Sequence, residues 1–87
     1  MQLGIHLDGE EDRYLRVPTL WDGIENQWIG FVKTPVTMKL LRGNGKTSAE
    51  LELSFNKCIK EAFESSKEMA DEIFEMFKPM SHWEKEL

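Results

Sequence analysis

The chain has 87 residues, 40% of them hydrophobic, and a net charge of −5, so it is long enough for one folded domain over residues 1–87 and too short for two. Its single cysteine, Cys58, excludes an internal disulfide scaffold and a cysteine zinc cluster, and it favours a reducing compartment. No apolar run reaches the ~20 residues of a bilayer-spanning helix, and the N-terminus is unlike a signal peptide, so we expect a cytoplasmic location and no membrane partner.

Two strands are predicted near the N-terminus. Apolar and polar residues alternate over residues 3–7, which is the period of a half-buried strand. Residues 14–17 can return as a second strand that ends at Pro18, because proline cannot donate to a strand ladder. Segment 18–27 is ambiguous, since it can form one helical turn or a tight turn at Asp22-Gly23.

The dipeptide Asn44-Gly45 predicts a β-hairpin, because a type I′ turn favours this dipeptide and alternating apolar residues flank it. A two-residue loop fixes a register that points six apolar residues at one core. The same register sets Lys39 opposite Glu50 on the other face, a favourable pair of opposite charges. The predicted apolar pairs are Val36 with Leu53, Met38 with Leu51, and Leu40 with Ala49.

Residues 28–33 also alternate like a strand, but the apolar positions change from odd to even after Thr34-Pro35. A one-residue bulge explains this change, and we therefore favour one long bent strand. The alternative is a Thr-Pro hairpin loop that brings Phe31 opposite Met38. It is less favoured because proline cannot adopt the positive φ of such loops.

From residue 56 to residue 78 the pattern becomes helical. We favour one helix of ~34 Å that ends at Pro79. In the alternative, Ser65 and Glu68 form a capping box that opens a second helix, and residues 81–84 can add a final turn. An arc of about 160° carries an apolar stripe with no charged residue: Phe55, Cys58, Ile59, Ala62, Phe63, Ser66, Met69, Ala70, Ile73, Phe74, Met76 and Phe77.

Together these elements predict an α+β fold. An antiparallel β-sheet of 4–5 strands, including the Asn44-Gly45 hairpin, packs against one long C-terminal amphipathic helix. Residues 1–55 are expected to be mostly β, residues 56–78 helical, and residues 79–87 a short tail or turn.

Catalytic and metal-binding patterns are incomplete. Residues 45–47 read Gly-Lys-Thr like the end of a P-loop, but Leu40 stands where that motif requires glycine, and a strand rather than a helix is expected to follow. His6 and Asp8 share a strand face but make only half of a metal site. The acidic run at 8–12 lacks the spacing of a calcium loop. We therefore expect no enzyme, no cofactor and no metal.

Charge favours a protein partner instead. Residues 1–47 hold six basic and six acidic residues, whereas residues 48–87 hold five basic and ten acidic ones. Such acidity suits a basic protein and makes nucleic acid an unfavourable partner. Like charges recur four residues apart on the predicted helix, and their repulsion is mildly destabilising. Repulsion that is tolerated in this way can indicate a role in binding, although a solvated helix face is the simpler interpretation. The acidic ridge consists of Glu61, Glu64, Glu68, Asp71, Glu72 and Glu75.

Three tryptophans, Trp21, Trp28 and Trp83, are further candidates for partner binding, because tryptophan often anchors interfaces, although a small core can also absorb it. The leading hypothesis is a non-enzymatic protein-binding domain, a small acidic inhibitor or adaptor of viral or mobile-element type, that engages a basic, nucleic-acid-handling partner. The alternative is a structural subunit that forms a homodimer through the helix end, which is rich in Met and Phe.

Overall fold

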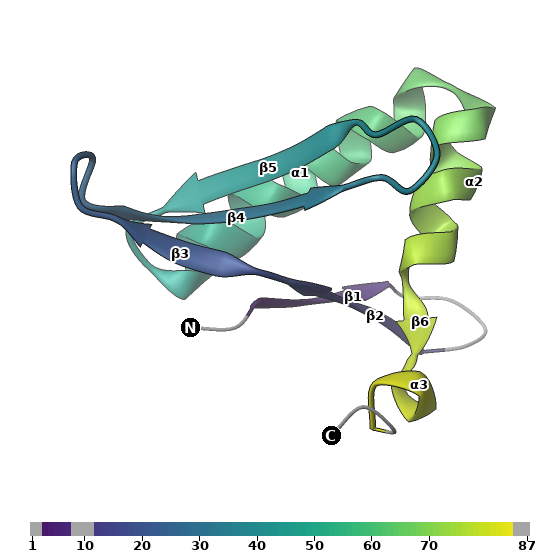
Figure 1. Ribbon diagram of the computed structural model, residues 1–87, viewed down its shortest axis with the longest axis horizontal. Coiled ribbons are helices and arrows are strands. Elements are labelled where there is room, and N and C mark those ends of the chain that lie inside the picture. The colour runs from purple at the N-terminus through teal and green to yellow at the C-terminus, as the bar shows by residue number, and fades with distance from the viewer. Residues whose placement is uncertain (1–2, 8–11, 85–87) are drawn as a thin grey trace.

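The computed structural model describes residues 3–7 and 12–84, which form an α+β fold of antiparallel strands and helices (Figure 1). The predicted fold class is confirmed, but the strands form two three-stranded sheets instead of one. In chain order the elements are β1 (Leu3–Leu7), β2 (Arg13–Val17), β3 (Thr19–Asp22), β4 (Gln27–Lys33), β5 (Leu40–Gly45), α1 (Ser48–Ser65), α2 (Lys67–Met76), β6 (Lys78–Pro79) and α3 (Met80–Glu84).

The first sheet has the strand order β1-β2-β6. β1 and β2 are the two predicted N-terminal strands, and they pair antiparallel with Leu3 opposite Val17. β2 ends before Pro18, as predicted. At its other edge β2 pairs with the two-residue strand β6, so that the segment after α2 returns to the N-terminal hairpin.

The second sheet has the order β3-β4-β5. Its first hairpin turns over residues 23–26, with Asp22 opposite Gln27, so the chain turns directly after Asp22 in a longer loop than the predicted tight turn at Asp22-Gly23. The Asp22 carboxylate accepts hydrogen bonds from the N–H groups of Ile24 at 3.0 Å and Glu25 at 3.4 Å. Asn26 has a φ of 54°, a conformation that asparagine tolerates better than most residues. The helical-turn interpretation of segment 18–27 is therefore wrong.

β4 and β5 are joined by the loop 34–39, so the prediction of one long bent strand is wrong. The Thr-Pro hairpin is wrong as well, since Phe31 lies opposite Arg42. The loop is closed by Thr34, whose N–H donates to the Lys39 carbonyl at 2.9 Å and whose hydroxyl accepts the Lys39 N–H at 2.9 Å. A buried threonine thus ends the strand where sequence parity suggested a bulge.

Asn44-Gly45 does not form the predicted hairpin turn. Gly45 instead ends β5 opposite Trp28, and α1 follows. A Cβ at Gly43 would lie 2.6 Å from the Phe55 backbone nitrogen, and a Cβ at Gly45 would collide with the backbone at Leu51. The glycines are therefore required because the α1 backbone packs directly on β5, and not because the chain turns.

The segment predicted as the second hairpin strand is the start of α1. Thr47 is the N-cap residue: its hydroxyl accepts the Glu50 N–H at 3.2 Å, while the Glu50 carboxylate accepts the Lys46 N–H at 2.8 Å. The hairpin register placed Val36, Met38 and Leu53 in the core, yet they are 80%, 59% and 72% exposed. The predicted Lys39–Glu50 pair also does not form.

The single long helix is interrupted at Ser66, so the prediction of one helix over 56–78 is wrong. Ser66 is extended (φ −165°, ψ 160°), and its hydroxyl accepts the Met69 N–H at 3.1 Å, which caps α2. The alternative of a second helix is confirmed, with the cap one residue later than Ser65. α3 contains the predicted final turn.

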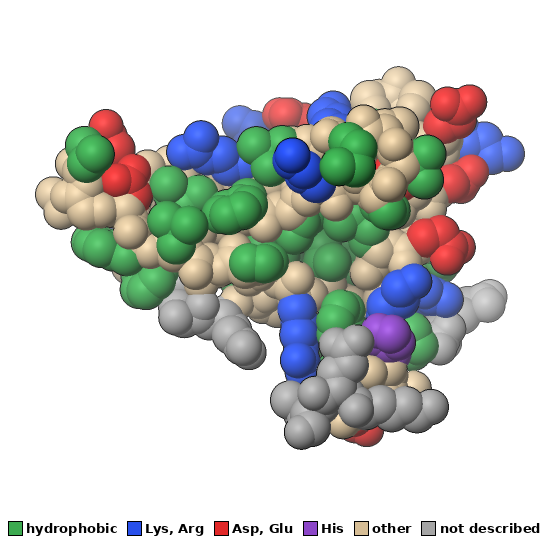
Figure 2. All heavy atoms as spheres, in the orientation of Figure 1, with side chains coloured by type: hydrophobic (Ala, Val, Ile, Leu, Met, Phe, Trp, Pro, Cys, Tyr) green, Lys and Arg blue, Asp and Glu red, His purple; other side chains and the backbone are tan. Residues whose placement is uncertain are grey.

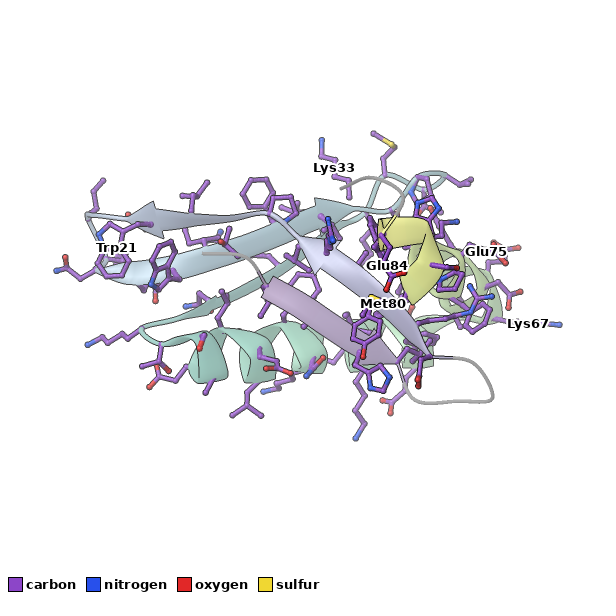
Figure 3. All side chains as sticks on the ribbon, turned by 90° about the horizontal axis from the view of Figure 1, so that it is seen from below. Trp21, Lys33, Lys67, Glu75, Met80 and Glu84 are labelled. Carbon is purple, nitrogen blue, oxygen red and sulfur yellow. The ribbon has the colours of Figure 1, made fainter. Side chains whose placement is uncertain are left out.

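The core lies where α1 crosses behind β4 and β5 and meets β1 and α2, while β2 packs beside β1 and contacts β4 (Figure 1). The predicted helix stripe supplies much of it. Figure 3 shows α1 on one side of the β3-β4-β5 sheet, and no described helix covers the other side. The buried apolar residues are Leu3, Ile5, Leu15, Val17, Leu41, Leu51, Phe55, Ile59, Ala62, Ile73 and Phe77.

Candidate functional site

An open hollow of about 430 Å³ lies between the loop 34–39 and α2. Its surface is mostly apolar, and four acidic residues come from the helix side. The hollow therefore combines apolar surface with negative charge. The lining residues are Pro35, Val36, Thr37, Glu68, Asp71, Glu72 and Glu75.

Glu72 fastens the loop to α2. Its carboxylate accepts hydrogen bonds from the Val36 N–H, from the Thr37 N–H at 2.9 Å and from the Thr37 hydroxyl at 2.9 Å. Only 9% of Glu72 is exposed. The sequence placed Glu72 on a solvated ridge, but the structure turns it inward as the acceptor for the Val36 and Thr37 N–H groups.

The bonds to the loop keep Glu72 charged. Burial raises the pKa of Glu72, but the N–H groups of Thr37 and Val36 and the hydroxyls of Thr37 and Thr34 lower it by more, so the pKa lies below the ordinary value of 4.5. A carboxylate that accepts several hydrogen bonds favours its ionised form in this way. The hydrogen bonds between the Glu72 carboxylate and the loop are therefore charge-assisted at neutral pH.

Thr34 completes the support of the loop from within. Its side chain is fully buried, and its hydroxyl lies 2.8 Å from the Thr37 hydroxyl. Together with the two bonds to Lys39, this contact holds both ends of the loop. The wall that Pro35 and Val36 form is thus held in place by contacts within the chain.

The other five residues of the acidic ridge are exposed, but they do not form one row. Glu68, Asp71 and Glu75 line the hollow, whereas Glu61 and Glu64 lie on α1 before the break at Ser66. Figure 2 shows acidic side chains gathered over α2. Within residues 3–7 and 12–84 none of these five carboxylates forms an ion pair.

The tryptophans lie away from the hollow. Trp21 and Trp28 occupy facing positions of β3 and β4 and make an edge-to-face contact with ring centroids 5.4 Å apart. Trp28 packs against the core, while Trp21 is 49% exposed. In Figure 3 Trp21 stands at the opposite end of the molecule from Glu75. Of the tryptophans proposed for partner binding, Trp21 is therefore exposed, but it lies far from the acidic residue Glu75.

Trp83 has an internal role. Its indole N–H donates to the Tyr14 carbonyl at 2.8 Å, and the Arg16 guanidinium lies 5.3 Å from its ring centre. Both contacts attach α3 to β2. Trp83 is only partly exposed as a result, and its bonding explains why the C-terminal turn forms.

The helix end proposed for self-association is largely covered inside the molecule. Phe77 is buried, and Met69 and Met76 pack against the core. The Arg13 guanidinium lies 4.5 Å from the centre of the Phe74 ring and donates to the Phe77 carbonyl at 2.8 Å. The N-terminal sheet therefore covers much of the stripe, whereas Phe74 and Met80 are each 41% exposed.

The Gly-Lys-Thr segment at 45–47 does lie between a strand and a helix, so one of the two arguments against a P-loop is overturned. The other remains, because Leu40 replaces the required glycine. The Lys46 N–H and the Glu50 N–H already bond to Glu50 and Thr47 at this helix start. The chain's own acidic side chain therefore occupies the position that a phosphate would take.

In the part of the chain that the structure describes, no group of three or more metal-ligating side chains occurs. His6 lies 3.2 Å from the Asp12 carboxylate, while Asp8 and the rest of the acidic run at 8–11 lie outside the described residues. Cys58 is partly buried against the core. None of the described helices is long and apolar enough to cross a bilayer.

Comparison with protein-family models, curated proteins and solved structures gives no significant match. The sequence predicted the acidic half of the hollow but missed the loop half, because it placed Val36 in a hairpin core. The signal that could have corrected this is Thr47-x-x-Glu50, a capping box that turns residues 48–55 into helix and releases the loop from strand pairing.

Proposed function

We propose that this chain is a non-enzymatic protein-binding domain that engages a basic protein through the hollow between the loop 34–39 and α2. One observation carries the proposal: Glu68, Asp71 and Glu75 are exposed beside the apolar wall of Pro35 and Val36. These carboxylates have no ion-pair partner among the described residues.

The composition of the hollow suits a lysine or arginine side chain. The aliphatic stem of such a residue packs on apolar surface while its charged end stays in a polar setting, and here Val36 supplies the first and the three carboxylates supply the second. Grouped carboxylates also raise the local negative potential, which speeds the encounter with a cationic partner.

The anchoring of the loop supports binding as well. Glu72 and Thr34 hold the wall in place, so binding requires little ordering of the loop. A preformed site loses less conformational entropy on association than a mobile one.

A basic, nucleic-acid-handling partner fits this surface, because proteins that bind nucleic acid present lysine and arginine to phosphates. An acidic face that takes the same side chains competes with the nucleic acid. The role that follows is that of an inhibitor or adaptor acting on such a partner.

The test compares two double variants that change the charge equally. E68Q/E75Q removes two carboxylates from the hollow, and E61Q/E64Q removes two from α1. With a fluorescein-labelled octaarginine peptide as the probe, the first variant is expected to raise Kd about tenfold and to flatten its salt dependence, and the second to change Kd by less than about twofold. Equal effects of the two variants would show that only net charge matters.

A third variant separates shape from charge. Val36→Ser leaves the carboxylates in place but removes the apolar wall, and it is expected to weaken binding about threefold. Affinity capture from the native host with wild-type and E68Q/E75Q baits then identifies a protein that depends on the hollow, and competition with nucleic acid for that protein tests the inhibitor role.

A further inference from the structure

The face of the β3-β4-β5 sheet that points away from α1 is an exposed apolar surface. In β5 exposed and buried residues alternate strictly, with Leu40 outward and Leu41 in the core. In β4 a Cβ at Gly30 would point at core side chains, so its neighbours Ile29 and Phe31 point outward. Leu20 lies opposite Ile29 and shares its face. Figure 2 shows the resulting group of hydrophobic side chains over these strands.

The two ends of this face carry opposite charges. The β3-β4 turn bears Asp22 and Glu25. At the other end Lys33 closes β4 and Lys39 precedes β5, and Arg42, which is exposed on the same face opposite Phe31, adds a third positive charge in this half. Figure 3 shows Lys33 standing on the side of the sheet away from α1. The charge therefore changes from negative at the β3-β4 turn to positive in the half that holds Arg42, Lys33 and Lys39, and the apolar residues lie between the turn and Lys33, beside Arg42.

We propose that two copies of this chain form a homodimer by packing these faces together with their strands antiparallel. The two-fold axis lies in the interface and perpendicular to the strands, so that the acidic turn of one copy covers the basic end of its partner. Leu20, Phe31 and Leu40, which are 46%, 37% and 49% exposed in the single chain, lose their contact with water at the centre.

The charge pattern selects a second copy as the occupant. An isologous interface must be complementary to itself, and an acid-apolar-base order is self-complementary only in the antiparallel arrangement. A parallel arrangement of the two faces would place acid on acid and base on base, which is unfavourable. A domain of this size also buries a limited fraction of its surface alone, so association adds to its stability.

The dimer surface and the hollow use different residues, so the homodimer goes beyond the proposed binding of a basic protein. Val36 and the α2 carboxylates take no part in it, and Phe31 takes no part in the hollow. Variants of one surface therefore leave the other measurable.

The first test is sedimentation equilibrium from about 5 to about 500 μM chain. Wild type is expected to change from monomer to dimer over this range. F31E is expected to raise the dimer Kd about tenfold or more, because it buries a charge at the centre of the interface. L53E is the matched control, since Leu53 is an exposed apolar residue on α1, and it is expected to leave Kd unchanged. Circular dichroism confirms that both variants fold.

The second test swaps charges across the interface. E25K and K33E are each expected to raise Kd about fivefold, because each contact occurs twice in a symmetric dimer. The double variant E25K/K33E restores opposite charges and is expected to return Kd to within about twofold of wild type. K57E on α1 changes net charge as K33E does and is expected to have no effect.

Three results would overturn the homodimer. One is a wild-type chain that stays monomeric throughout the concentration range. Another is a dimer that F31E does not weaken or that the double charge swap does not restore. The third is a monomeric chain that binds a different protein through this face, shown by loss of that complex in F31E but not in L53E.

Discussion

The carboxylate of Glu72 on α2 accepts both the backbone N–H and the side-chain hydroxyl of Thr37, a residue 35 positions earlier in the chain. This contact ties the loop between two strands to a helix formed much later. It removes one acidic residue from the exposed ridge and holds in place the apolar wall beside which three of the other five, Glu68, Asp71 and Glu75, lie.

Replacement of Glu72 is therefore expected to release the loop while the fold remains. In Glu72→Ala the Val36 and Thr37 N–H groups lose their acceptor, and buried donors without partners are unfavourable. We expect a lower Tm and an increase of about tenfold or more in the hydrogen-exchange rates of these two amides. Glu64→Ala, which removes an exposed carboxylate, serves as the control; unchanged exchange in Glu72→Ala would contradict the anchor.

The same carboxylate predicts a pH dependence of stability. Hydrogen bonds hold the folded-state pKa of Glu72 below the ordinary 4.5. Between these two pKa values the unfolded chain binds more protons than the folded one, so the free energy of unfolding decreases as pH falls. The contribution of Glu72 is complete above about pH 4.5 and is lost as pH drops through the lower folded-state pKa. Urea unfolding from pH 7 to pH 3 is expected to show a smaller loss in Glu72→Gln than in wild type. Parallel pH profiles of the two proteins would exclude this role.

Gly43 predicts a large effect from a small substitution. In Gly43→Ala the new methyl group would lie 2.6 Å from the Phe55 nitrogen, and α1 must move away from β5 to admit it. We expect a loss of about 3 kcal/mol in the free energy of unfolding, at the upper end of the range for overpacked cores. Gly4→Ala, where no atom lies within 4 Å of the new group, is expected to change stability by less than about 0.5 kcal/mol. Urea unfolding measures both, and similar losses would contradict the close contact.

The sequence predicted the elements whose pattern is local. The strands at 3–7 and 14–17 alternate cleanly, and the apolar stripe through Ile59 and Ile73 follows the helical period, so their structure is readable from spacing alone. The break at Ser66 was available as an alternative. It could not be decided, because the stripe stays in phase across the break.

The prediction for residues 44–55 was wrong because the same residues fit both a strand pattern and a helix pattern. Leu51 and Leu53 alternate as in a strand, and Asn44-Gly45 is the preferred hairpin dipeptide. Leu51 is also four residues before Phe55, on the same face of a helix capped by Thr47. The structure follows the helix because both glycines are needed where α1 meets β5.

The candidate site was only half predictable for a different reason. Charge on α2 follows directly from the residues, so the exposed carboxylates were identified. The inward turn of Glu72 depends on a loop far away in the sequence, and no local pattern records that contact. The outward orientation of Phe31 could likewise be assigned only once the core contacts at its neighbour Gly30 were known.

The close seating of α1 on β5 also limits how this protein can evolve. Substitutions on its outer surfaces are tolerable, but any side chain at Gly43 or Gly45 would push the helix off the strand, and loss of Thr47 or Glu50 would weaken the helix start. Distant relatives are therefore expected to keep the spacing Gly-x-Gly-x-Thr-x-x-Glu after the rest of their sequence has diverged, and that short signature offers a way to find them.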